Sequence, residues 1–275
     1  MATASAKSFL TLSFSGAGHL LPYHLGAAKA LLAHANELPH IRAVSGSSSG
    51  AMAACVMALI PHRLEEYSNR FLEDRGYAFR NLETMLQEEE STTTTATARA
   101  GGLQLDICTT KCSDGSMHLF SFDSASASRD KILQAVQASC QIPSSFHPID
   151  VFSSMPLQYG DGVAIDGVLY ADGGIAAPAP PTSLDHEQGA IPLRISPISG
   201  SGVNRISPKD ASFSLPFTLT ARCGTFQIRP SIQNLRSMMG AAGAMNPETL
   251  HSWYQRGQED TAVFLEQQQH SWNAS

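Results

Sequence analysis

The feature that most constrains this chain is a serine flanked by glycines at the junction of two apolar segments. The run Gly46-Ser47-Ser48-Ser49-Gly50 follows the apolar stretch 41–44 and precedes a helix-like stretch over 51–59. A serine at a sharp turn from strand to helix is held in a strained backbone that exposes its hydroxyl, and flanking glycines let neighbouring backbone approach closely. Ser48 is therefore the first candidate nucleophile, with Gly46 and Gly50 as the glycines of the turn.

The order of segments before this turn predicts a parallel sheet with helices on its faces. An alternating run over 9–14 predicts a strand that enters a glycine turn, leucines and alanines at helical spacing predict a helix over 20–35, and 41–44 predicts the next strand. Helices between strands are typical of parallel sheets, whose active sites lie at the carboxyl ends of the strands. Ser48 and the loop 16–18 both occupy such ends.

The rest of the chain continues this pattern, and one domain, 1–275, is expected, with a core over about 8–200 and a mostly helical C-terminal extension over 201–275. The further helices are expected over 63–87, over 129–138 and from 230 onward. The further strands are expected at 103–109, at 118–122, between 157 and 170, and at 193–196. The connections are expected to be a loop or insertion over 88–102, hairpin turns at Asp161-Gly162 and Asp166-Gly167, and a surface connection at the Pro-rich run 176–182.

Charge and composition exclude several classes of partner and place the protein in a cell compartment. The net charge is −6 and no Lys/Arg cluster occurs, which argues against a nucleic-acid partner. The longest apolar run, 51–60, is shorter than the roughly 20 residues that span a bilayer. The cysteines are five in number and scattered, which favours buried free thiols and a reducing, cytoplasmic compartment. We therefore expect a protein that can touch a membrane surface but does not cross it.

The loop Gly16-Ala17-Gly18 is a candidate oxyanion hole for the serine chemistry. It lies just before a predicted helix N-terminus, where unpaired backbone N–H groups and the helix dipole favour negative charge. A tight turn without chemistry, or a phosphate-binding loop, would give the same glycines. The phosphate alternative is disfavoured because Leu21 stands where the third glycine of a dinucleotide-binding loop would be.

A serine nucleophile needs a base, and the sequence offers either a histidine or a carboxylate. Five histidines after Ser48 could complete a Ser-Asp-His triad: His62, His118, His147, His186 and His251. The usual α/β-hydrolase plan has several strands before its serine turn, whereas this chain has two. The carboxylate candidate is Asp172, which follows the apolar run 168–170 and precedes two glycines that would clear room around it.

These segments resemble the patatin-like phospholipase domain, most closely its adipose triglyceride lipase branch. The similar segments are Ser13 to Gly18, Tyr23 to Gly26, the Gly-Ser-Ser-Ser-Gly turn and the Asp172-Gly173-Gly174 turn, in that order and separation. The resemblance implies a three-layer α/β/α sandwich with a mainly parallel central sheet, and a Ser-Asp dyad without a catalytic histidine. On this chain it makes Ser48 the nucleophile, Asp172 the base and the backbone of Gly16, Ala17 and Gly18 the oxyanion hole. The chain departs from the family pattern at Leu21 and at Pro178-Ala179-Pro180.

The expected function is a serine acyl hydrolase that cleaves ester bonds of neutral glycerolipids, with triacylglycerol as the expected substrate. We expect it to act in the cytoplasm, peripherally at a lipid-droplet or membrane surface, with no metal and no organic cofactor and with room for a protein activator. The alternatives are a phospholipase A, lysophospholipase or acyltransferase of the same fold, and a non-catalytic lipid-surface module.

Two further clusters carry weaker alternatives. Cys108 and Cys112 with His118 could be offered as metal ligands, but strand thiols are the simpler interpretation because a fourth ligand and the usual spacing are missing. Met238, Met239 and Met245 could line a lipid-binding surface or fill a core.

Overall fold

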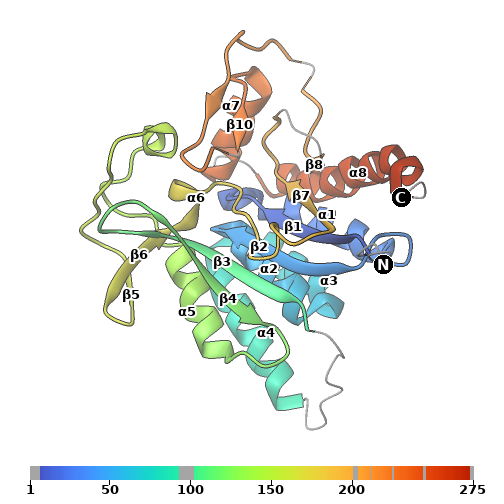
Figure 1. The fold of residues 1–275 in the computed structure, drawn as a ribbon, viewed down its shortest axis with the longest axis horizontal. Helices are drawn as coiled ribbons and strands as arrows, with labels where there is room; N and C mark the ends of the chain where they lie inside the picture. Colours follow the sequence, from blue (N-terminus) through green and yellow to red (C-terminus); the bar gives the residue numbers. More distant parts are fainter. Residues whose placement is uncertain are drawn as a thin grey trace, which may run out of the picture.

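The computed structural model places a twisted sheet at the centre of the molecule (Figure 1). It describes residues 7–92, 102–200, 204–210, 212–224, 226–243 and 246–272. The eight strands of the sheet are β1 (Phe9–Phe14), β2 (Ile41–Ser47), β3 (Gln104–Lys111), β4 (Met117–Asp123), β5 (Val163–Ile165), β6 (Val168–Asp172), β7 (Ala190–Ile195) and β8 (Arg205–Ile206). Their order is β5-β6-β3-β2-β1-β7-β8, and β4 also pairs with β3.

The middle of this sheet is parallel and one side is antiparallel. The pairs β1–β2, β2–β3, β1–β7 and β7–β8 are parallel, whereas β4 and β6 each run antiparallel to β3, and β5 pairs antiparallel with β6. The expected α/β fold with a mainly parallel central sheet is therefore confirmed. The turn Asp166-Gly167 joins β5 to β6 with positive φ at both residues, as expected of a tight hairpin.

Long helices cover one face of the sheet, where they share its main core. They are α1 (Leu21–Ala33), α2 (Ser49–Leu59), α3 (Leu64–Glu73), α4 (Ala78–Thr92), α5 (Arg129–Ser139) and α8 (Pro247–Trp272). Leu10, Leu12 and Phe14 alternate along β1 toward these helices and are fully buried. A second cluster of short elements, β9 (Leu219–Thr220), β10 (Gln227–Ile228) and α7 (Ile232–Ala241), lies beyond the edge of the sheet near α6 (Gly173–Ala176) (Figure 1).

The opposite face of the sheet is polar and is covered by the Pro-rich segment. Hydroxyls on this face donate to that segment and to the residues just after it: Ser45 to the Pro180 carbonyl at 3.0 Å, Ser47 to the Pro178 carbonyl at 2.9 Å and Thr11 to Asp185 at 2.6 Å. The expectation of a surface connection over 176–182 is wrong, since these residues are mostly buried. Proline lacks an N–H but keeps a carbonyl, so this run can be buried without leaving backbone donors unpaired.

Three other local expectations are corrected. The single helix expected over 63–87 is two helices, because Asp74 accepts the Gly76 N–H at 3.1 Å and turns the chain between α3 and α4. Residues 88–92 are helical rather than a loop, and Glu88 pairs with Arg63 at 2.6 Å. Residues 93–101 of the expected insertion lie outside the described part of the chain. Asp161-Gly162 is no hairpin turn, because β5 begins only at the next residue and pairs with β6.

The C-terminal helix α8 packs directly on α1 through two glycines. A Cβ on Gly26 would lie 2.0 Å from the Tyr254 carbonyl oxygen, and one on Gly257 would lie 2.2 Å from that of Tyr23. The helices can therefore approach closely only where both side chains are missing. Within the described ranges, no helix is both long enough and apolar enough to cross a membrane.

Candidate active site

The strands β2 and β6 end against each other along one edge of β3. The strand β4 pairs with β3 from Gln104 to Thr110 and so occupies the other edge. On the shared edge, Ser47 at the end of β2 is opposite Cys108, and Asp172 at the end of β6 is opposite Thr109. Because Ser48 follows Ser47, this register brings Ser48 and Asp172 together. Asp172 does end a strand, as expected, but the strand is antiparallel to its neighbour.

The backbone of Ser48 has the strained geometry expected of an exposed serine at a sharp turn. Its φ is 52° and its ψ is −128°. Residues other than glycine rarely adopt this backbone conformation, which costs on the order of 1–3 kcal/mol. The Ser48 N–H donates to Ser139 Oγ at 2.9 Å, and the Ser139 hydroxyl donates to the Cys108 carbonyl at 2.6 Å. The end of α5 therefore holds this turn in place. Sequence reasoning missed Ser139, which has no local motif.

Both glycines of the turn are required by close backbone contacts. A Cβ on Gly46 would lie 2.2 Å from the Gly50 carbonyl oxygen, and one on Gly50 would lie 2.3 Å from that of Phe14. Helix α2 can therefore begin directly over the ends of β1 and β2. This close packing fixes the direction in which the Ser48 side chain leaves the turn.

Asp172 is a buried carboxylate that lines the same cavity as Ser48. It is 6% exposed and caps the short helix α6, where its Oδ1 accepts the Gly174 N–H at 2.8 Å. Burial raises the pKa of Asp172 to about 6, although hydrogen bonds from the Ser48 side chain and the Gly174 amide act in the opposite direction. A carboxylate with this pKa is a better proton acceptor near neutral pH than an exposed aspartate.

The loop Gly16 to Gly18 also reaches this site, and its amides differ in availability. A Cβ on Gly16 would lie 3.6 Å from both the Ser48 Cβ and the Gly174 Cα. The Gly16 N–H donates to the Pro178 carbonyl at 2.7 Å, and the Ala17 N–H donates to Ser49 Oγ at 3.1 Å. Among the described residues, the Gly18 N–H has no acceptor. Gly18 has a φ of +50° and faces the cavity beside Ser48.

The two departures from the family pattern have structural explanations. Leu21 is fully buried in the main core at the start of α1. Pro178 anchors the segment after Asp172, because its carbonyl accepts from both the Gly16 N–H and the Ser47 hydroxyl. The Asp172 turn, the serine turn and the glycine loop are therefore tied to one another.

The candidate histidines do not meet Ser48. His62 lies 3.3 Å from Glu89, His118 packs against the rings of Phe120 and Tyr170, and none of the described residues that line the Ser48 cavity is a histidine. His24, which was not a candidate base, is fully buried, and its Nε2 lies 2.8 Å from the Ser15 carbonyl oxygen. Burial lowers the pKa of His24 to about 4, so the ring is neutral and supports the glycine loop from behind.

One cavity of about 300 Å³ joins the serine, the aspartate and the glycine loop. Ser48 and Asp172 lie at its base with all three residues of the loop, and the remaining walls are almost entirely apolar. The large apolar side chains of these walls are Ile142, Phe146, Val151, Phe152, Ile175, Ile198, Phe226, Ile228 and Met238. The lining contains no Lys or Arg among the described residues, so Asp172 is its single ionisable group.

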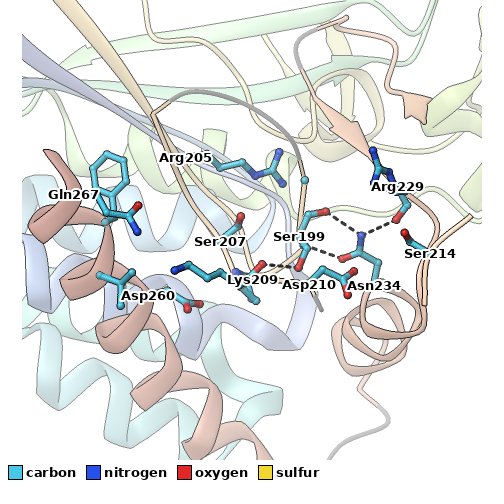
Figure 2. Close-up of a pocket in the computed structure, with 14 residues that line it drawn as sticks. Ser199, Arg205, Ser207, Lys209, Asp210, Ser214, Arg229, Asn234, Asp260 and Gln267 are labelled. Carbon is cyan, nitrogen blue, oxygen red and sulfur yellow. Dashed lines mark hydrogen bonds between the residues drawn. The ribbon is translucent and has the colours of Figure 1, made fainter. Parts of the chain in front are cut away.

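A second, polar cavity of about 370 Å³ lies apart from Ser48 and Asp172 (Figure 2). Its walls include Arg205, Lys209, Asp210 and Asp260. Figure 2 shows Asn234 bonded on two sides, with its amide N–H donating to the Ser199 and Arg229 carbonyls, both at 2.9 Å. These bonds fasten α7 to the loop after β7.

The cysteines proposed as strand thiols lie on and just after β3. Cys108 is inside the strand and Cys112 follows its last residue. Burial raises the pKa of both thiols. In the part of the chain with described coordinates, no three His, Cys, Asp or Glu side chains are grouped so that they could hold a metal ion.

The fold and the site together define an α/β protein with a strained serine turn and a buried aspartate in one apolar cavity. Comparison with known proteins gives its family. The patatin-like phospholipase family profile matches residues 12–185. The chain is 27% identical over 270 residues to human patatin-like phospholipase domain-containing protein 4, covering 93% of this chain and 96% of that protein. It is 27% identical over 265 residues to mouse patatin-like phospholipase domain-containing protein 2, covering 92% of this chain and 49% of that protein.

The chain belongs to the patatin-like phospholipase family, which supports a lipid ester hydrolase activity. The matches to proteins 4 and 2 agree with the expected placement near the adipose triglyceride lipase branch. The chain spans nearly all of protein 4 but about half the length of protein 2. Among solved structures, VipD from Legionella pneumophila is similar over 95% of this chain and 68% of its own, with a TM-score of 0.44 and 13% identity.

Proposed function

We propose that the protein hydrolyses esters of neutral glycerolipids, with triacylglycerol as the preferred substrate, through a Ser48-Asp172 dyad. The observation that carries this proposal is the strand register that brings Ser48 and the buried Asp172 carboxylate, whose pKa is raised, together in the lining of one apolar cavity. A long acyl chain gains free energy when it leaves water for such walls. The lining offers no cation to a phosphate group, which favours a neutral ester over a phospholipid.

In the proposed mechanism, Asp172 accepts the Ser48 proton as Ser48 Oγ attacks the ester carbonyl carbon. The tetrahedral intermediate carries a negative charge on the former carbonyl oxygen, which the Gly18 N–H at the start of a helical turn can receive. The proton on Asp172 then passes to the leaving alkoxide, which leaves a Ser48 acyl ester. Asp172 deprotonates a water that attacks this ester, and the proton then passes from Asp172 to Ser48 Oγ as the fatty acid is released.

A non-catalytic lipid-surface module is the second candidate, and one observation favours it. The Gly16 and Ala17 amides, which the oxyanion would need as further donors, are both engaged inside the protein. Catalysis would then require the oxyanion to replace Pro178 O or Ser49 Oγ as their acceptor.

A serine-reactive fluorophosphonate probe separates the two candidates. We expect the wild-type protein to be labelled and Ser48→Ala not to be, with Ser47→Ala as the matched control on the neighbouring serine. A panel of tri-, di- and monoacylglycerols and phospholipids then tests the substrate class. Equal labelling of Ser48→Ala would refute the nucleophile, and faster release of fatty acid from phospholipid would refute the substrate.

A further inference from the structure

The stretch 211–247 differs in charge from the rest of the protein. It contains three arginines, Arg222, Arg229 and Arg236, and no Asp or Glu, although the net charge of the whole chain is −6. Its described part also exposes many large apolar side chains, each 40–73% exposed. They are Phe213, Leu215, Phe217, Ile232, Leu235, Met238 and Met239. Exposed apolar area on this scale marks a site of interaction rather than ordinary surface.

Helix α7, at the centre of this stretch, turns its polar side inward and its apolar side outward. Asn234, Ser237 and Gly240 are buried, whereas Leu235, Arg236 and Met239 are exposed. The inward side is fixed, because Asn234 bonds the Ser199 N–H at 2.8 Å as well as the two carbonyls seen in Figure 2. The apolar side is therefore held outward by polar anchors and is not an unpacked part of the core.

The exposed apolar surface continues into the Ser48 cavity. A shallow groove of about 410 Å³ is lined by Phe213, Leu215, Ile232 and Leu235 among others. Phe152, Ile228 and Met238 line both this groove and the cavity that contains Ser48. Apolar side chains thus run from the outer side of α7 to the candidate active site. Figure 1 shows α7 and β10 on the opposite side of the sheet from α4 and α5 in this view, and α6 and α7 both contribute to the lining of the Ser48 cavity.

We propose that this surface, which we call the α7 face (Phe213, Leu215, Ile232, Leu235, Arg236 and Met239), docks on an anionic phospholipid surface, with the exposed Arg229 at the neighbouring polar cavity as a second cation. This inference deepens the proposed function. It rests on that function because docking would serve to bring the lipid substrate to Ser48. Apolar side chains would enter the boundary between headgroups and acyl chains, while Arg229 and Arg236 meet anionic headgroups. Both arginines are exposed, and neither forms an ion pair with a described carboxylate.

Docking in this orientation would connect the substrate with the catalytic groups. The shared residues Phe152, Ile228 and Met238 give an acyl chain an apolar route from the lipid into the cavity. An acyl chain on this route would stay in contact with apolar side chains. The arginines account for a preference for negative charge, which apolar side chains alone do not supply.

The test measures binding of the full chain to phosphatidylcholine vesicles with and without phosphatidylserine. All proteins carry Ser48→Ala, so that hydrolysis does not alter the vesicles. An apolar variant, Leu235→Gln with Met239→Gln, should lose at least tenfold in partition to both vesicles. A charge variant, Arg229→Gln with Arg236→Gln, should lose mainly the preference for phosphatidylserine, by about fivefold for each arginine. The matched controls are Val168→Gln and Lys131→Gln, which lie exposed on β6 and α5 and should bind like the parent.

Three readouts separate the possible outcomes. Thermal melting shows that each variant is folded, and turnover of a soluble short-chain ester by the same variants on the Ser48 background reports the dyad without a lipid surface. Parental vesicle binding by both α7-face variants would overturn the docking proposal. So would a change of oligomeric state by size-exclusion chromatography without a change in vesicle binding, because the face would then join two copies. Absent ester turnover with intact vesicle binding would refute the proposed function and leave the docking surface standing.

Discussion

At the scale of single residues, the site depends on a carboxylate whose burial works against its charge. Asp172 is buried beside the Ser48 hydroxyl, and its pKa is raised to about 6. Only its ionised form can accept the Ser48 proton. We therefore expect kcat/KM toward a soluble short-chain ester to fall as the pH drops through about 6. A profile that is flat across this range, or that falls only near the ordinary pKa of 3.8, would contradict the assignment.

The same burial predicts that the charge of Asp172 destabilises the fold. The pKa of Asp172 in the folded state lies above the ordinary value of 3.8. The protonated carboxyl therefore stabilises the folded state fully below pH 3.8, and this stabilisation is lost as the pH rises through about 6. Asp172→Asn removes the charge and should raise the free energy of unfolding near pH 7 by about 1–3 kcal/mol. Urea unfolding of both proteins measures this. Equal free energies of unfolding near pH 7 would show that the buried charge of Asp172 does not destabilise the fold.

Ser139 is expected to act by positioning, because its hydroxyl bridges the Ser48 N–H and the Cys108 carbonyl. Ser139→Ala leaves both groups without this partner and should cost about 1–3 kcal/mol of stability. It should also lower kcat more than it raises KM, since the Ser48 turn loosens. The matched control is Ser126→Ala, whose hydroxyl bonds Asp123 on the surface. Equal effects of the two substitutions would argue against a special role for Ser139.

At the scale of elements, local sequence patterns predicted the turns that form the site, but not which strands pair or which residues are hydrogen-bonded to each other. The serine turn and the Asp-Gly-Gly turn were readable because glycine spacing and apolar runs are local signals. The antiparallel direction of β6 could not be predicted, because an apolar run does not indicate which strand it will pair with or in which direction. The burial of Pro178 was missed for the same reason, since its hydrogen-bond partners, Gly16 and Ser47, are distant in sequence.

The contact between α1 and α8 gives a prediction at this scale. Gly26→Ala places a Cβ 2.0 Å from the Tyr254 carbonyl oxygen, so the helices must separate. We expect a loss of about 1–3 kcal/mol of stability by urea or thermal unfolding. Gly160→Ala is the matched control, because a Cβ there meets no atom within 4 Å. If both substitutions have the same small effect, the close approach of the two helices is not required for stability.

At the scale of the whole molecule, three distant segments are tied into one site by shared partners. Pro178 joins the Asp172 segment to the glycine loop and to β2, Ser139 joins α5 to the serine turn, and Asn234 fastens α7 beside the cavity. The sequence indicated Ser48 and Asp172 as the candidate catalytic residues, and the structure brings them together. The apolar cavity that surrounds them is built from side chains between Ile142 and Ala242 that have no shared local pattern.

The central claim is that Asp172 takes the Ser48 proton directly, and ester turnover by a small set of folded variants tests it most directly. Ser48→Ala should abolish turnover, and Asp172→Asn should lower it by about a hundredfold or more, because it keeps the shape but loses the proton acceptor. Alanine substitutions at His62, His118, His147, His186 and His251 should be far milder. One histidine variant as inactive as Ser48→Ala, together with a mild Asp172→Asn, would contradict the dyad and require a triad instead.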